Sequence, residues 1–314
     1  MTTTTRTRVG RPDLLWVAWR GNRATIIAAG AVALVAVGWI LWAAATTGTG
    51  FEGRVIPYWY VLGSQPLLSA ETLFAAAIAV FWAAPLVARE YEQRTHLVVW
   101  GQDITAARWL AGQVVVVGLV VVGLAAALGT ATYFLVGRME LRESGYSLFS
   151  QERFEAVPHV QIAHAVFGLA LGLACSALIR RTLPAMALTL VGFIGVRLVL
   201  VTWGRSYYLP PVRSFQAWGP AGVGPVRQVP ISARYVDSGY ADVNHVPMPA
   251  PSACLKVRDY TQCVMDNGVA GHFADFQPVD RVGVFRWIES GIFIALAAAL
   301  LALAWYWVRR ARTR

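Results

Sequence analysis

The chain has 314 residues, of which 57% are hydrophobic and 14% are charged, and its 27 basic and 17 acidic residues give a formal net charge of +10. Its mean hydropathy is +0.52, whereas a soluble globular domain carries about 25% charged residues. This composition argues against a soluble domain and predicts a polytopic membrane protein. The single lysine, Lys256, follows no glycine-rich run, so the chain lacks the P-loop of a nucleotide hydrolase.

Six apolar runs are long enough to cross a bilayer, which takes about 20 residues. They lie at 24–46, 68–88, 106–136, 159–179, 183–203 and 284–308. We therefore predict an all-α polytopic membrane protein with six transmembrane helices. The first run is too long for a signal-peptide core, so we expect it to be retained. In the fourth run, Gly168 and Gly172 form a small-xxx-small pattern that permits close helix contact, although such patterns are frequent in Ala/Gly-rich helices.

The arginines gather on one side of this topology. The amino terminus, the link between the second and third spans, the 180–181 turn and the carboxyl tail together hold 14 basic and 4 acidic residues. The opposite segments, 47–67, 137–157 and 204–283, hold 11 of each kind. Because basic residues concentrate on the cytoplasmic side, we predict cytoplasmic amino and carboxyl termini in a cell inner (plasma) membrane.

The chain divides into four parts. Residues 1–12 are predicted to be a disordered basic tail, and 13–203 carry the first five spans. Residues 204–283 are rich in Pro and Gly and too long for a connector, so they predict a small external subdomain. Residues 284–314 are the sixth span and a basic cytoplasmic tail. The stretch after Pro12 fits either an interfacial helix or the beginning of the first span.

Two cysteines, Cys254 and Cys263, lie nine positions apart in the predicted external subdomain, flanked by His245 and His272. A disulfide suits an oxidising compartment. A two-Cys, two-His metal site would space its paired ligands two to five positions apart, which these residues do not, and free thiols are the third alternative. We favour the disulfide and predict no metal site.

Ionisable residues are rare inside the predicted spans. Arg197 in the fifth span and Glu289 in the sixth are expected at similar depth, nearer the outer surface. They predict an intramembrane polar pair or snorkelling side chains, with a role in lining a transport path as the alternative. The spans are otherwise nearly bare of ionisable groups, which argues against an intramembrane enzyme and an ion-coupled transporter.

The 86–105 link interrupts the apolar chain with charged residues. Pro85 precedes it, and Glu90 and Arg94 stand four positions apart, a spacing that supports a helix. The apolar segment that follows is too short to span a membrane. This pattern predicts a docking surface for a partner protein; the alternative is a solvated loop with interfacial anchors.

Two stretches carry a resemblance to a known family. "PLVAREYEQRTHLVVWGQDITAARWLAG" and "FGLALGLACSALIRRTLPAMALTLVGFIGVRLVL" resemble actinobacterial ABC-2 type permeases, and the similarity covers most of residues 13–310. The resemblance implies a fold like the G-subfamily exporters, a dimer, expected to be a homodimer, and two copies of a separate ABC ATPase. ATP and Mg²⁺ would be bound by that ATPase, with no cofactor in this chain. The 86–105 link would be the coupling segment, whose expected ATPase contacts are Glu90, Glu92, Arg94, His96 and Trp100.

These observations predict a permease subunit of an ABC transporter, not itself an enzyme, in contact with membrane lipid and with no nucleic acid. It would export a hydrophobic or amphipathic compound, such as a drug, an antibiotic or a lipid, by alternating access. One alternative is a non-transporting membrane receptor or scaffold that uses the 204–283 segment. Another is a membrane enzyme with a site in that segment.

Overall fold

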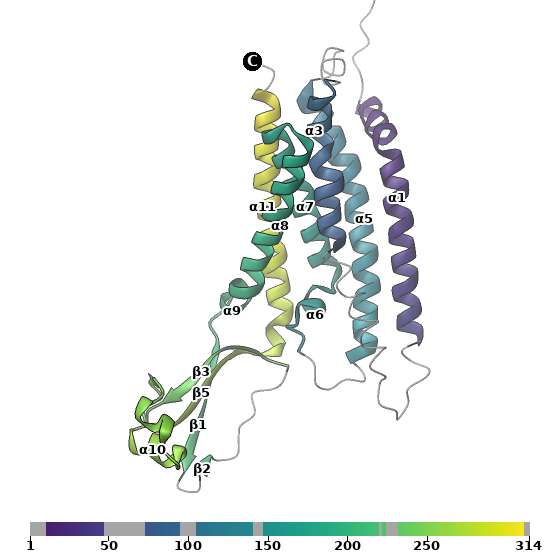
Figure 1. Ribbon diagram of the computed structural model, residues 1–314. Helices are drawn as coiled ribbons and strands as arrows, with labels where there is room; N and C mark the ends of the chain where they lie inside the picture. The colour runs from purple at the N-terminus through teal and green to yellow at the C-terminus, as the bar shows by residue number, and fades with distance from the viewer. Residues whose placement is uncertain are drawn as a thin grey trace, which may run out of the picture. The chain divides into compact units, whose positions relative to one another are not determined.

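The computed structural model describes residues 11–46, 73–94, 105–140, 147–219, 222–223 and 232–310. These residues belong to two compact units (Figure 1). The first unit contains the described residues of Met1–Arg142, Glu155–Leu198 and Arg286–Arg314. The second contains those of Glu143–Phe154 and Val199–Phe285. The first unit is helical, and the second carries a β-sheet.

Long helices make up the first unit. They are α1 (Arg11–Thr46), α3 (Ala84–Glu92), α5 (Ala106–Glu140), α7 (Pro158–Ile179), α8 (Thr182–Val199) and α11 (Val282–Arg310), with the π-helical turn η1 (Ile78–Ala83) before α3. Within this unit α1 packs against α5, and α7 packs against α5, η1 and α3. Their shared core is formed by small and branched apolar side chains such as Ala83, Val117 and Leu173.

Six helices in the described part of the chain are long and apolar enough to cross a membrane. They are Leu14–Thr46, Leu73–Glu92, Ala106–Arg138, Pro158–Ile179, Thr182–Tyr207 and Val279–Arg310. The predicted number of spans is therefore confirmed. Large apolar side chains on the outside of these helices, such as Leu34 and Val35 of α1, are exposed, as expected for side chains that contact lipid rather than water.

The stretch after Pro12 is helical, and its interfacial position stays a prediction. α1 runs without interruption from Arg11 to Thr46, so the stretch after Pro12 belongs to the same helix as the span. Residues 1–10, the core of the predicted disordered tail, lie outside the described residues.

The second unit contains a five-stranded antiparallel sheet. Its strands are β1 (Val212–Gly219), β2 (Gly222–Val223), β3 (Arg234–Ala241), β4 (Pro247–Met248) and β5 (Gly271–Gln277), in the order β2-β1-β5-β3-β4. In the central pairing, Phe215 lies opposite Phe273, and Ser238 lies opposite Ala274. The all-α prediction is therefore wrong over this segment. Burial alternates from residue to residue along β5. This period of two suits a strand in a sheet rather than a helix.

Short helical elements complete the second unit. They are α6 (Gln151–Glu155), which ends at the boundary with the first unit, the π-helical turn η2 (Leu200–Gly204), α9 (Arg205–Tyr207), η3 (Ser252–Lys256), α10 (Tyr260–Asp266) and η4 (Val279–Arg281). A disulfide joins Cys254 of η3 to Cys263 of α10. The hydroxyls of Tyr240 and Tyr260 lie 3.0 Å apart. This hydrogen bond, together with burial, raises the pKa of Tyr240 above its ordinary value.

Candidate functional site

Close backbone contact with α7 fixes the position of η1 and α3. A Cβ atom built on Gly172 would lie 2.5 Å from the Cβ of Ala83, far inside van der Waals contact. One turn further along α7, the Ser176 hydroxyl accepts hydrogen bonds from the backbone N–H groups of Val87 at 3.2 Å and Ala88 at 2.7 Å. The small-xxx-small pattern thus corresponds to a close contact between helices, which holds the carboxyl-terminal half of the second span against α7.

The end of α3 is tied to the turn between α7 and α8. The Glu92 carboxylate accepts hydrogen bonds from the backbone N–H of Thr182 at 2.9 Å and from its hydroxyl at 2.5 Å. Because Thr182 is the first residue of α8, Glu92 satisfies an N–H that has no partner within that helix and places a negative charge at its positive end. A second contact joins the α7–α8 turn to α3, because the Arg180 guanidinium lies 4.9 Å from the centre of the Tyr91 ring.

The structure places three of the five predicted ATPase-contacting residues at this end of α3. Glu92 contacts α8, and Glu90 lines a cavity described below. Arg94 is exposed in the turn after α3 and has a φ of 54°, the left-handed region that favours glycine. His96 and Trp100 lie outside the described residues. The ATPase contact itself remains a prediction for all five.

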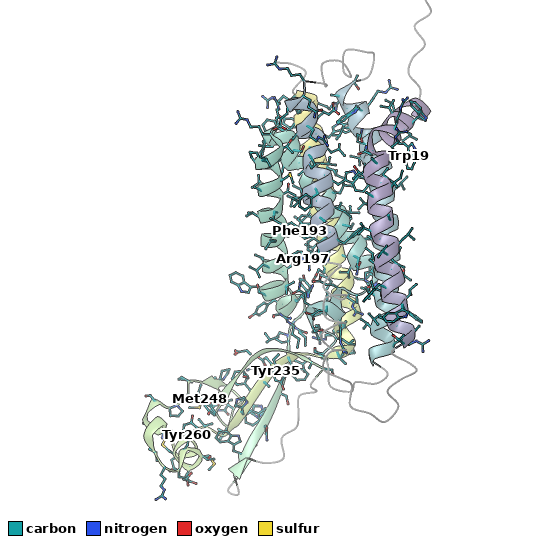
Figure 2. All side chains as sticks on the ribbon, turned by 45° about the vertical axis from the view of Figure 1, so that its right-hand side comes forward. Trp19, Phe193, Arg197, Tyr235, Met248 and Tyr260 are labelled. Carbon is teal, nitrogen blue, oxygen red and sulfur yellow. A yellow bond between two sulfur atoms is a disulfide. The ribbon has the colours of Figure 1, made fainter. Side chains whose placement is uncertain are left out.

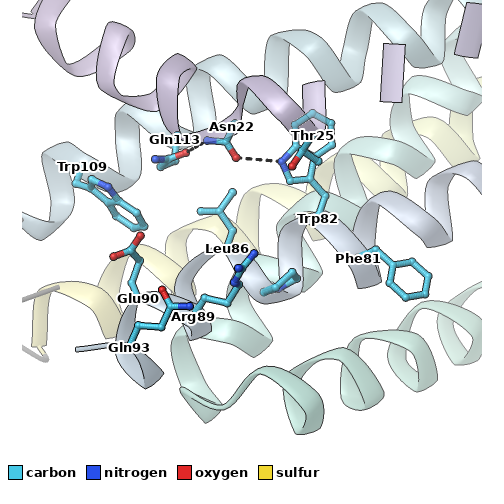
Figure 3. A pocket seen from close by; sticks show the side chains of 12 residues that line it. Asn22, Thr25, Phe81, Trp82, Leu86, Arg89, Glu90, Gln93, Trp109 and Gln113 are labelled. Atoms are coloured by element: carbon cyan, nitrogen blue, oxygen red, sulfur yellow. Dashed lines mark hydrogen bonds between the residues drawn. The ribbon is translucent and has the colours of Figure 1, made fainter. Parts of the chain in front are cut away.

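A cavity of about 270 Å³ lies next to the end of α3 (Figure 3). Side chains from α1, from η1 and α3, and from α5 form its wall. The polar ones are Asn22, Thr25, Arg89, Glu90, Gln93 and Gln113. So many hydrogen-bonding groups are unusual between helices that are otherwise apolar, which marks this cavity as a candidate binding site.

Asn22 connects three helices at one side of the cavity. Its amide group donates to the side-chain oxygen of Gln113 at 2.7 Å and to the carbonyl oxygen of Ala18 at 2.8 Å. Its own side-chain oxygen accepts from the indole N–H of Trp82 at 3.2 Å (Figure 3). These residues were not among the predicted site residues, although isolated amide side chains at the edge of apolar runs were a visible signal.

A second polar group of side chains lies within the first unit around Arg197, which Figure 2 labels beside Phe193. The guanidinium of Arg197 donates to the carboxylate of Glu155 and lies 3.0 Å from Nδ1 of His164. Nε2 of the same histidine lies 3.5 Å from the Glu289 carboxylate. All four side chains are buried. The predicted pair of Arg197 and Glu289 is therefore part of a larger network in which His164 stands between them.

The comparison with known families bears directly on this region. Residues 60–205 match the model of a family described as ABC-2 membrane transporter related. This match supports an ABC-2 type permease. Such permeases are membrane subunits that are generally non-catalytic and that associate with an ABC ATPase. No curated protein and no solved structure matches the chain.

The matched segment contains most of the features described above. It includes the end of α3, the α7–α8 turn and three of the four residues of the buried network around Arg197, whereas Glu289 lies outside it. The permease match and the six apolar helices together support a multi-pass membrane protein.

Proposed function

We propose that this chain is the permease subunit of an ABC transporter in the plasma membrane, and that it exports a hydrophobic or amphipathic compound by alternating access. Two copies, as a homodimer, bind two copies of a separate ATPase, which holds ATP and Mg²⁺. The observation that carries this proposal is the family match over residues 60–205. The fold like that of the G-subfamily exporters, implied by the sequence resemblance, is part of the same proposal.

The contacts at the end of α3 suggest how ATP-driven motion reaches the spans. In this proposal the ATPase binds the link that follows α3, beginning with the exposed Arg94. Glu92 makes two hydrogen bonds to Thr182, so a displacement of the end of α3 either moves the beginning of α8 or breaks both bonds. The α7 contacts at Gly172 and Ser176 oppose independent motion of α3. We therefore infer that α3, α7 and α8 move together.

The apolar spans support an apolar or amphipathic cargo. A ligand shifts an equilibrium between two states only through a difference in its affinity for them. The exposed side chains that a cargo could meet on these helices include Leu34, Phe81 and Leu183, all large and apolar. Export, rather than import, is likewise a proposal that follows from the family resemblance.

Co-purification tests whether the chain associates with an ABC ATPase, the proposed source of energy for transport. The tagged chain would be isolated in mild detergent from its native membrane, and mass spectrometry would identify the proteins that accompany it. We expect an ABC ATPase with the wild type and about two- to five-fold less with Arg94→Ala, as for the loss of an exposed charged contact. Arg138→Ala removes an exposed arginine from the last turn of α5, at the opposite end of that helix from the link, and should leave recovery unchanged.

The alternative functions predict a different outcome of this experiment. A receptor or scaffold that works through residues 204–283 requires no ATPase. Absence of any ABC ATPase from the wild-type preparation in several detergents would therefore contradict the permease proposal. Equal losses with Arg94→Ala and Arg138→Ala would contradict the assignment of the contact to the end of α3.

A further inference from the structure

We infer that the cavity between α1, α3 and α5 binds the phosphate-bearing head group of a membrane amphipath (Figure 3). This cavity shares Glu90 with the predicted ATPase contact, but its test requires no ATPase. Failure of the lipid-binding test would therefore leave the transporter proposal standing. Failure of the transporter proposal would likewise leave the inferred lipid site standing.

Unused hydrogen-bond donors face the cavity. The Arg89 guanidinium lines it and donates to no acceptor among the residues that the structure describes. Gln113 is only 7% exposed. Its side-chain oxygen is occupied by Asn22, while its amide N–H groups find no acceptor in the described part of the chain. Because Gln113 lines the cavity, these amide donors remain available to a ligand or to water.

The chemistry of these donors favours an anionic group rich in oxygen atoms. A guanidinium presents parallel N–H groups that match the spacing of phosphate oxygens, and the Gln113 amide adds a neutral donor. Glu90 points toward Trp109 in Figure 3. Glu90 lines the same cavity and has a partner of its own within the protein.

The size of the cavity fits a head group rather than a whole lipid. Its volume of about 270 Å³ lies just below the range of about 300–1,000 Å³ typical of drug-sized ligand sites. Its wall follows the second span from Gln93 to Phe81, which are twelve positions apart, or roughly 18 Å along a helix. At the far end the Phe81 side chain is 70% exposed. The acyl chains would therefore leave the cavity past Phe81 and remain in the bilayer.

Native mass spectrometry of the full chain in detergent tests this inference. The probes are dioleoyl phosphatidylglycerol and dioleoylglycerol, which has the same chains but no phosphate. We expect one phosphatidylglycerol to bind preferentially and its affinity to fall about ten-fold or more in Arg89→Gln, since hydrogen bonds to a charged group are lost. Gln113→Leu, which removes the amide and leaves an apolar side chain in its place, should also weaken binding. The thermal unfolding midpoint of each variant would verify that it folds.

The matched control is Arg23→Gln. Arg23 is an exposed arginine on α1, next to Asn22 in sequence, that does not line the cavity, so its loss should leave binding near the wild-type value. Equal weakening by Arg23→Gln and Arg89→Gln would overturn the inference, because general surface charge would then explain the binding. Equal binding of dioleoylglycerol would overturn the role of the phosphate. Displacement of the lipid by inorganic phosphate at a similar concentration would overturn the inference, because the cavity would then bind free phosphate rather than the head group of a membrane amphipath.

Discussion

The lack of a side chain at Gly172 is what allows α7 to touch η1, and substitution there gives a prediction with a definite sign. In an ordinary helix, Gly→Ala stabilises by about 1 kcal/mol. Here the added Cβ would lie 2.5 Å from Ala83 Cβ and 2.6 Å from the Ala79 carbonyl oxygen, so the helices must separate, at a cost of about 1–3 kcal/mol. We expect Gly172→Ala to lower the thermal unfolding midpoint in detergent.

A glycine with open space around it supplies the control. A Cβ on Gly195 of α8 would meet no atom within 4 Å, so Gly195→Ala should leave the midpoint unchanged or raise it. If both variants shifted the midpoint in the same direction, the close contact at Gly172 would not be a determinant of stability. Both would be compared at one heating rate, because unfolding of large proteins is often irreversible.

The sequence predicted some charged residues of the buried network but not their partners. Arg197 and Glu289 stand out because each interrupts an apolar run, and their similar depth suggested that they are near each other. His164 and Glu155 could not be assigned to the same network from spacing, since the four residues come from separate segments of the chain. Which faces of α7, α8 and α11 meet depends on helix rotation, and apolar runs without a polar stripe do not specify rotation.

The contact between α3 and α8 gives a prediction for how two elements are joined. In Glu92→Ala the Thr182 N–H loses its carboxylate acceptor, so the first turn of α8 should open more readily. We expect hydrogen–deuterium exchange at this amide to become about five-fold faster, in line with the loss of one hydrogen bond. Peptides that cover residues 180–186 would report it by mass spectrometry.

Glu92→Gln is the matched variant, since it keeps one side-chain oxygen as an acceptor but removes the charge. Its exchange rate at Thr182 should lie between those of the wild type and Glu92→Ala. Identical exchange in all three proteins would mean that the hydrogen bonds of Glu92 do not hold the beginning of α8, and the proposed joint motion of α3 and α8 would lose its basis.

The hydrophobic pattern of each helix or strand decided how well it could be predicted from the sequence. The six long apolar runs gave the six helices because only helices satisfy their own backbone in lipid. The sheet of the second unit was missed, although β5 alternates buried and half-buried side chains along "GHFADFQ". Its strands are short and separated by Pro- and Gly-containing segments. Strand pairing joins distant residues, such as Phe215 and Phe273, which composition alone does not reveal.

At the scale of the whole molecule, the features with functional meaning lie in the helical unit. The match over residues 60–205 includes α3, α7 and α8, the three helices joined by Gly172, Ser176 and Glu92. The cavity beside α3 lies in the same unit. We therefore propose that energy enters at the link after α3 and is transmitted to the helices packed against it. The central claim is a direct ATPase contact at that link.

Site-specific photo-crosslinking in the native membrane tests this claim most directly. A photo-reactive residue would replace Arg94 in one variant and Arg138, in the last turn of α5, in another. We predict that light joins the first variant to a protein with the P-loop of an ABC ATPase, identified by mass spectrometry, and that the second forms no such adduct. Absence of an ATPase adduct at position 94, or equal adducts at both positions, would contradict the account.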